Sequence, residues 1–310
     1  MRYDESPSAD AVAERVHSDH HVISITAEDF RRHICDVVYH LDEPRVGVGA
    51  FSQYMVAKAA SEKVKVILTG HGGDELFCGY PIYKVRFFAN LLNERSPRIL
   101  ALPFLFKMNE LPFFVYFSVF ALWNRQIRYG LPILFAHKEW RRIFSEDFYS
   151  QISCYNPSEE LDSLLHNFTG TPLEQIQYLY LKTYLPSLFI VEDKIGMAHS
   201  VESRTPLCDN EMVDFALSIP TSKKLYKQQL KYIVRESMRA DLPDILYYQR
   251  KKGFPTPFSK WIRSELKEFV TDVLLDQRAR QRGLFDLKFV EQMLTRHFRT
   301  KNEFSQKCYL

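Results

Sequence analysis

The sequence predicts an α/β fold with a parallel sheet, and three observations lead to that class. A short β-branched run at residues 64–68 is typical of a buried parallel strand. A glycine-rich loop, Thr69-Gly70-His71-Gly72-Gly73, follows it directly. Upstream of both, helical and extended patterns alternate along the chain, as they do in proteins built around parallel sheets.

The elements before the loop follow from local patterns. Residues 8–16 have apolar side chains at helical spacing, and residues 21–25 alternate like a short strand. Thr26 and the acidic residues that follow it are the start signal of a helix with an apolar face through Leu41. A further helix is expected at residues 51–63. The order is therefore helix, strand, helix, helix and strand.

Composition sets the class of protein. The chain has 310 residues, 46% hydrophobic and 25% charged, which is the balance of a globular protein with a sizeable core. Its formal net charge of +3 is too small to indicate a nucleic-acid partner. The 5 cysteines are scattered without metal-ligand spacing, so we expect reduced thiols and a cytoplasmic location.

The glycine loop has the features of a ligand site. Glycines at 70, 72 and 73 allow positive φ and a close approach to the backbone. Open α/β sheets bind ligands at the carboxyl ends of their strands, which is where this loop lies. Asp74 and Glu75 follow, and a carboxylate there can hold Mg²⁺ bridged to phosphates. The alternative is a plain strand-to-helix turn whose acidic residues favour the helix dipole.

Apolar runs at residues 97–140 predict a buried helical insertion, or alternatively a surface that contacts a partner or touches a membrane. Each run is shorter than the roughly 20 residues of a membrane-spanning helix, so no membrane span is expected.

Three further segments carry charge. Asp42 and Glu43 end a helix before a proline, and either they point into a site or they are an ordinary acidic helix end. Glu202 and Arg204 come just before Pro206, which favours a loop or a helix end. Arg250, Lys251 and Lys252 precede a glycine and two prolines, so they form either a rigid loop that reaches a polyphosphate or a basic surface loop.

Five ordered blocks of this sequence resemble the synthetase domain of the glutamine-hydrolysing asparagine synthases. They cover roughly residues 1–265 and are His40-Leu41-Asp42-Glu43-Pro44, residues 68–80 around the glycine loop, Asp193-Lys194-Ile195-Gly196-Met197-Ala198, Glu202-Ser203-Arg204-Thr205-Pro206 and Lys251-Lys252-Gly253-Phe254-Pro255-Thr256-Pro257.

The resemblance implies a fold of the ATP-pyrophosphatase (adenine nucleotide alpha hydrolase-like) type with a helical C-terminal part. The nucleotide-binding part would be residues 1–95, the helical insertion 96–170, and a helical part with substrate and phosphate motifs 171–310. The implied reaction uses ATP to adenylate a carboxylate, usually that of aspartate, and releases pyrophosphate. Ammonia from glutamine then displaces AMP to form an amide.

The resemblance also implies roles for particular residues. Thr69 and Gly70 match the strand-end pair whose backbone contacts the nucleotide, with Gly72 and Gly73 in the same cofactor-binding loop. Asp74 matches the acidic residue that helps to hold Mg²⁺ and pyrophosphate. Lys251 matches the lysine that stabilises phosphate charge, which is electrostatic catalysis. The matched blocks further supply Asp193, Glu202 and Arg204 as candidate substrate contacts.

This sequence departs from the family at three positions. His71 stands where the family commonly has Glu or Asp, or Tyr in some β-lactam-forming relatives; it could act as a general base without carrying a negative charge. Lys194 stands where arginine is usual, and Gly196 where serine is usual. These changes weaken aspartate as the expected acceptor and leave a peptide or a sugar acid as alternatives.

Two features of the family are absent from this sequence. One is the Ser-Gly-Gly-x-Asp-Ser pyrophosphate loop, and the other is the glutaminase domain that supplies ammonia. We therefore expect either a fragment of a longer protein or a split polypeptide completed by a partner, inactive by itself. The alternative is a catalytically inactive remnant that serves as a binding or regulatory subunit.

Overall fold

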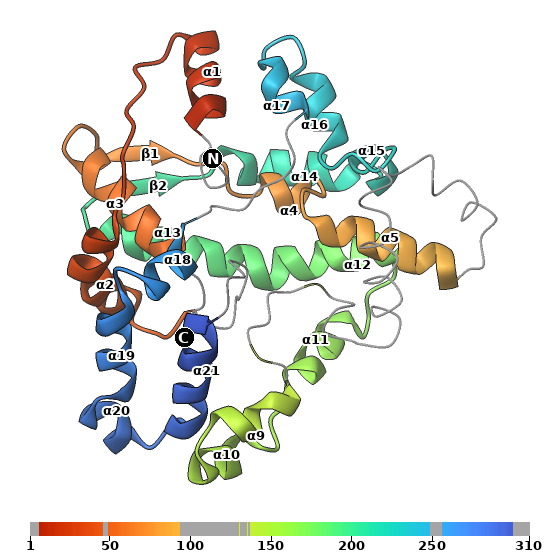
Figure 1. Ribbon diagram of the computed structural model, residues 1–310. Helices are drawn as coiled ribbons and strands as arrows, with labels where there is room; N and C mark the ends of the chain where they lie inside the picture. The colour runs from red at the N-terminus through yellow and green to blue at the C-terminus, as the bar shows by residue number, and fades with distance from the viewer. Residues whose placement is uncertain are drawn as a thin grey trace.

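A computed structural model describes residues 6–45, 49–93, 130, 135, 137–248 and 256–299. This part of the chain is mostly helical and contains one small parallel sheet (Figure 1). The strands are β1 (Val66–Leu68) and β2 (Glu202–Arg204). The α/β class predicted from the sequence is therefore confirmed, with more helix than the sheet-centred prediction implied.

The helices fall into groups along the chain. The first group is α1 (Ser6–Val16), α2 (Ala27–Leu41) and α3 (Gly49–Ser61), and after β1 come α4 (Gly73–Leu76) and α5 (Pro81–Asn93). The middle group is η2 (His137–Glu139), α9 (Trp140–Ile143), α10 (Glu146–Ile152), α11 (Pro157–Leu165), α12 (Pro172–Leu179), η3 (Tyr180–Tyr184) and α13 (Leu185–Met197). The last group follows β2 and is η4 (Pro206–Cys208), α14 (Asn210–Ser218), α15 (Thr221–Lys224), α16 (Tyr232–Ser237), α17 (Asp244–Tyr248), α18 (Phe258–Arg263), α19 (Lys267–Leu275), α20 (Gln277–Arg282) and α21 (Leu287–Arg299).

The two strands bring distant parts of the sequence together. They run parallel with Val66 opposite Glu202 and Leu68 opposite Arg204. The expectation that the first strand is buried was wrong, because the side chains of Val66 and Leu68 are 39% and 70% exposed. Within the described ranges no third strand pairs with β1. The strand therefore lacks the neighbours that bury a central strand of a larger parallel sheet.

The strand predicted at residues 21–25 is absent, since these residues have no regular secondary structure. Val22 and Ile23 are 62% and 38% exposed, so this alternating pattern has no partner strand and no core to face. The predicted helix start at Thr26 is confirmed. Thr26 and Asp29 form a reciprocal capping box at the beginning of α2.

A long helical rod crosses the middle of the molecule and leads to β2 (Figure 1). It consists of α12 and α13 joined by η3, a π-helical turn. Pro186 lies at the start of α13 and cannot donate to the carbonyl four residues before it. A wider turn just upstream of such a proline keeps the rod continuous.

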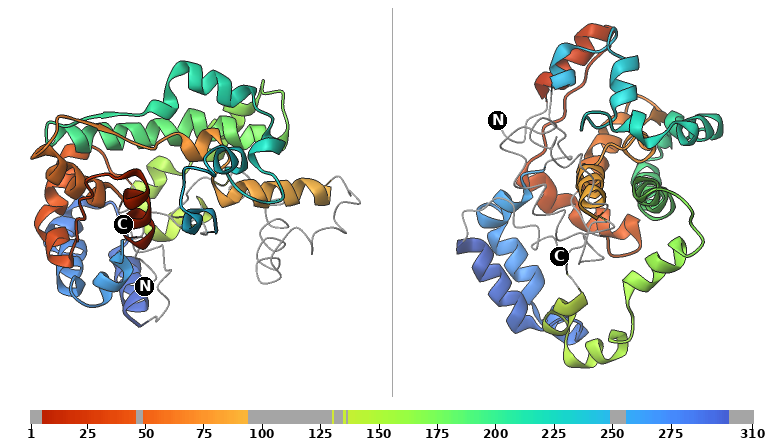
Figure 2. Two further views of the ribbon diagram at one scale, coloured as in Figure 1. Left: turned by 90° about the horizontal axis from the view of Figure 1, so that it is seen from above. Right: turned by 90° about the vertical axis from the view of Figure 1, so that its right-hand side faces the viewer.

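The main core lies beside this rod, among α2, α3, α13 and α18. It contains buried Phe30, Phe51, Ile195 and Trp261, with Phe30 packed edge-on against Phe51 at 5.1 Å between ring centroids. Two further views show that the C-terminal helices gather on the side of α2, away from α5 (Figure 2).

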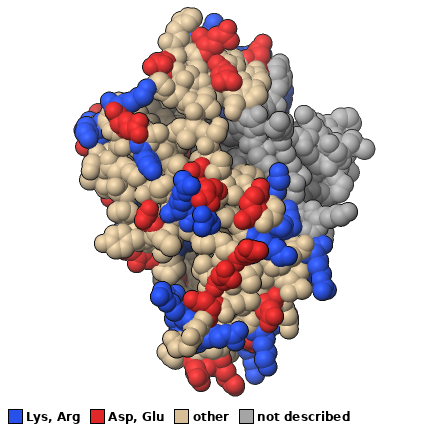
Figure 3. Space-filling view, turned by 60° about the vertical axis from the view of Figure 1, so that its left-hand side comes forward, with Lys and Arg blue, Asp and Glu red and all other residues tan. Residues whose placement is uncertain are grey.

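Most of the apolar stretch at residues 97–140 lies outside the described residues, so its two interpretations stay predictions. No described helix combines the length and the apolar composition that crossing a membrane would require. Acidic and basic side chains are interspersed over the face drawn in Figure 3, in keeping with the small net charge.

Candidate functional site

The glycine loop begins where β1 ends. The Gly73 amide donates to the Gly70 carbonyl at 3.3 Å and closes the turn. Gly72 has a φ of 88°, and a Cβ on it would lie 2.3 Å from the Sγ of Cys208. A Cβ on Gly70 would meet no atom within 4 Å. The loop is therefore tightly held at Gly72, while its backbone at Gly70 is open to a ligand.

Asp74 lies in the first turn of α4 and forms an ion pair with Lys231. The Nζ of Lys231 is 2.9 Å from the Oδ1 of Asp74. Lys231 comes from a turn in which Lys227, Gln228 and Lys231 itself all have positive φ, between 46° and 62°. A Cβ on Gly79 would lie 1.9 Å from the Asp74 Oδ1 and 2.4 Å from the Lys231 Cε. Only glycine at 79 leaves room for this pair.

His71 and Glu192 form the second ion pair of the site. The Nδ1 of His71 contacts the Oε2 of Glu192, which extends from α13. Glu192 is buried, and its other oxygen accepts a hydrogen bond of 2.7 Å from the Ser203 hydroxyl on β2. Three separate elements thus fix one carboxylate beside the glycine loop.

The two partners shift each other's ionisation. The hydrogen bond to Glu192 raises the pKa of His71, although burial opposes the shift. Burial would raise the pKa of Glu192, but the hydrogen bonds from His71 and Ser203 outweigh it and hold that pKa below its ordinary value. Both shifts favour the charged pair. Contact at Nδ1 places the ring proton there and leaves Nε2 to exchange protons with a ligand.

Buried hydrogen bonds made by Gln177 and Lys224, which we call the clamp, hold the last turn of α4. Gln177 donates to the carbonyls of Leu76 at 2.6 Å and Glu75 at 3.3 Å, which belong to the last turn of α4. The Nζ of Lys224, itself 1% exposed, donates to the Gln177 Oε1 at 3.3 Å. The Tyr80 hydroxyl donates to the buried carboxylate of Glu75. Because a helix of four residues is unstable alone, this clamp keeps Asp74 in place.

Glu202 and Arg204 do not lie on a loop or a helix end, as Pro206 had suggested. They belong to β2, and their side chains pair with each other at 2.7 Å. Alternation along a strand sends both outward, where they are exposed, and turns Ser203 toward Glu192. The structure thus brings Ser203 into contact with the His71–Glu192 pair. The two predicted substrate contacts, Glu202 and Arg204, point away from that pair.

Asp193 is exposed on α13, and its neighbour Glu192 faces His71 instead. Asp42 behaves as an ordinary helix end. It caps α2 in a left-handed conformation and pairs with Lys194 at 2.7 Å, which lowers the pKa of Asp42. Lys251 lies outside the described residues.

Sequence reasoning missed Glu192, Ser203 and Lys231. Glu192 and Ser203 stand next to or inside the charged motifs, and helical and strand periodicity could have picked them out from their neighbours. Lys231 has no motif around it. Only the fold, through an unusual backbone turn, carries it to Asp74.

Comparison with known proteins gives a consistent match. The family model described as asparagine synthase matches residues 1–310. "Asparagine synthetase [glutamine-hydrolyzing] 1" of Bacillus subtilis (strain 168) is 27% identical over 294 residues, which cover 92% of this chain and 45% of that protein. "Amidase chyE" of Penicillium rubens is 25% identical over 333 residues, which cover 96% of this chain and 49% of that protein. The chain thus spans about half the length of these curated relatives.

We expect Glu192→Gln to destabilise the chain in a pH-dependent way. The raised His71 pKa makes its contribution fully present below 6.5 and lost as pH rises through the folded-state value. The lowered Glu192 pKa makes its contribution present above 4.5 and lost as pH falls. The loss in free energy of unfolding, about 1–3 kcal/mol, should be largest between those values and become smaller once the pH rises above the folded-state pKa of His71.

Chemical unfolding at a series of pH values measures this difference. Glu202→Gln is the matched control, because that exposed carboxylate should contribute less than about 1 kcal/mol. A difference between Glu192→Gln and the unmodified chain that stays constant with pH would contradict the ion pair.

Proposed function

Because the chain belongs to the asparagine synthase family, we propose that it carries the synthetase half of an ATP-dependent amide-forming enzyme. In this reaction ATP adenylates a carboxylate and pyrophosphate leaves, and then ammonia derived from glutamine displaces AMP. The observation that carries the proposal is the His71–Glu192 pair at the carboxyl end of β1, beside Asp74 and the open backbone of Gly70.

His71 would act as the general base toward the attacking nitrogen. Its Nδ1–H is engaged by Glu192, so in the neutral form of the ring Nε2 is the nitrogen that accepts the proton. The buried carboxylate then stabilises the imidazolium that forms, as an acidic partner does in other base-orienting pairs. The ionised pair of imidazolium and carboxylate has no net charge, so it does not reproduce the negative charge that a lone carboxylate brings at this position in the family.

The nucleotide would bind at the glycine loop, in an ATP-pyrophosphatase type of fold. Thr69 and Gly70 offer backbone groups at the strand end, and Gly72 and Gly73 keep side chains out of the way. Lys251 and its basic neighbours would neutralise phosphate charge, as the family resemblance implies.

Asp74 is the residue that would hold Mg²⁺. Mg²⁺ commonly binds through one or two carboxylates together with substrate phosphates, so one carboxylate at the loop fits this chemistry. The Lys231 ammonium lies at one oxygen of that carboxylate, so Mg²⁺ would bind at the other oxygen or displace the ammonium. Bound metal would screen phosphate charge during the adenylation. Lys231 would then be free to contact the phosphates.

The exposed strand β1 supports completion by further sequence. Leu68 and Val66 expose apolar surface of the kind that a neighbouring strand and its crossover helix cover together in a larger parallel sheet. The segment that bears a Ser-Gly-Gly-x-Asp-Ser loop, and a glutaminase domain or subunit, would provide that strand and the ammonia. Residues 1–95 would form the nucleotide-binding part, with the helical insertion at 96–170 and the remaining motifs at 171–310.

The direct test measures pyrophosphate release from ATP with candidate carboxylates, using the chain together with a segment that carries the missing loop. We expect carboxylate-dependent release that Asp74→Ala lowers by at least about 100-fold, the usual scale for losing one electrostatic contact to the reacting group. Glu268→Ala, which removes an exposed acid on α19, is the control and should change little. Failure of every carboxylate would contradict the proposal and favour a catalytically inactive subunit.

The identity of residue 71 also bears on the acceptor. A neutral base in place of a carboxylate favours an acceptor other than aspartate, such as a peptide or a sugar acid. We expect the completed enzyme to turn over aspartate poorly and His71→Glu combined with Glu192→Gln to increase that turnover, because the double variant places a carboxylate at position 71 without a second buried carboxylate against it. Steady-state rates with aspartate as the carboxylate measure this. Efficient use of aspartate by the unmodified enzyme would contradict the alternative acceptor.

A further inference from the structure

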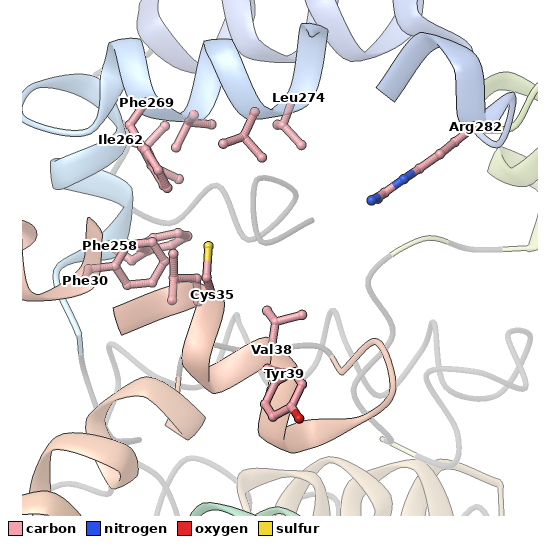
Figure 4. A pocket seen from close by; sticks show the side chains of 12 residues that line it. Phe30, Cys35, Val38, Tyr39, Phe258, Ile262, Phe269, Leu274 and Arg282 are labelled. Carbon is pink, nitrogen blue, oxygen red and sulfur yellow. The ribbon is translucent and has the colours of Figure 1, made fainter. Parts of the chain in front are cut away.

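A cavity of about 500 Å³ lies between α2 and the C-terminal helices α18–α20 (Figure 4). Its volume is within the roughly 300–1,000 Å³ of small-ligand sites. Phe30 and Phe258 form its inner wall, with ring centroids 4.6 Å apart. Other apolar side chains, among them Ile262 and Phe269, complete the lining. The cavity is thus suited to an apolar body.

This cavity is separate from the glycine loop. Its lining residues come from α2, α18, α19 and the end of α20, and none of them belongs to β1, α4 or α13. Figure 1 shows α19 and α20 at the far end of the molecule from α4. The mouth is apolar as well, since Val38 and Val273 are 59% and 54% exposed. Exposed apolar surface around a cavity usually marks a place where another molecule binds.

Among the described residues that line the cavity, one has a charged side chain. Arg282 ends α20, and its guanidinium points into the open space between the two walls (Figure 4). Among the described residues none forms an ion pair with it. A guanidinium matches a carboxylate with two parallel hydrogen bonds. The charge at the mouth is therefore complementary to an anionic head group.

We propose that this cavity binds an amphipathic carboxylate, with its aliphatic or aromatic body between α2 and α19 and its carboxylate on Arg282. The apolar walls give affinity that grows with the size of the body, and the arginine selects a single anionic head. Neither feature depends on ATP or on the glycine loop. The proposal therefore stands or fails independently of the amide-forming activity.

Cysteine protection tests the site directly on the full chain. Cys35 lines the cavity and is exposed, whereas Cys154 is exposed on the turn after α10 and provides an internal control. Decanoate, below its micelle-forming concentration, should slow alkylation of Cys35 by at least about fivefold and leave Cys154 unchanged, as read by peptide mass spectrometry. Equal protection of both cysteines, or of neither, would overturn the proposal.

Varying the head group and the chain length of the ligand distinguishes a specific site from non-specific hydrophobic binding. Protection should strengthen roughly fourfold for each added methylene from octanoate to dodecanoate, following the transfer free energy of a buried CH₂. Decanol should protect less than decanoate. Arg282→Gln should weaken decanoate binding by about five- to tenfold, and Arg278→Gln on the same helix should not. Equal effects of the two arginine variants, or equal protection by decanol, would overturn the assignment of the head group.

Discussion

The ion pair between His71 and Glu192 is the interaction on which the rest of this site depends. It joins the loop after β1 to α13, and Ser203 ties the same carboxylate to β2. A buried carboxylate is costly unless it is paired and hydrogen-bonded, so these contacts have to form together. Once they form, the position of the imidazole relative to the strand end is set, and so is the nitrogen that faces outward. The pair thus lies where the short sheet and the long rod meet.

The second constraint is that two positions of the site, Gly72 and Gly79, have to lack a Cβ atom. Gly72 and Gly79 admit Cys208 and the Asp74–Lys231 pair into positions that a Cβ would occupy. The clamp of Gln177 and Lys224 then fixes the other end of α4. A four-residue helix is thereby held at its first turn by a half-buried ion pair and at its last turn by buried hydrogen bonds. Rigid support of this kind is what a site needs in order to place a base and a carboxylate at fixed separations.

Features that depend only on neighbouring residues in the chain could be predicted from the sequence. The cap at Thr26, the parallel strand before the glycine loop and the role of Asp42 as a helix end all follow from neighbouring residues. Features that depend on tertiary contacts could not be predicted in this way. The alternation at residues 21–25 carries no information on whether a partner strand exists, and the proline after Arg204 did not reveal that β2 precedes it. Glu192 rather than Asp193 faces the site because of helix phase, and Lys231 arrives through a fold-dependent turn.

The most direct test of this account is an NMR titration of the His71 ring in the unmodified chain and in Glu192→Gln. The hydrogen bond to a buried carboxylate raises the pKa of His71, so the titration midpoint should lie above the ordinary 6.5 and fall when the carboxylate becomes an amide. His33 pairs with exposed Asp36 at 3.3 Å and provides an internal reference that the substitution should not affect. A His71 midpoint at or below 6.5 that is unchanged in Glu192→Gln would contradict the pair at the centre of this site.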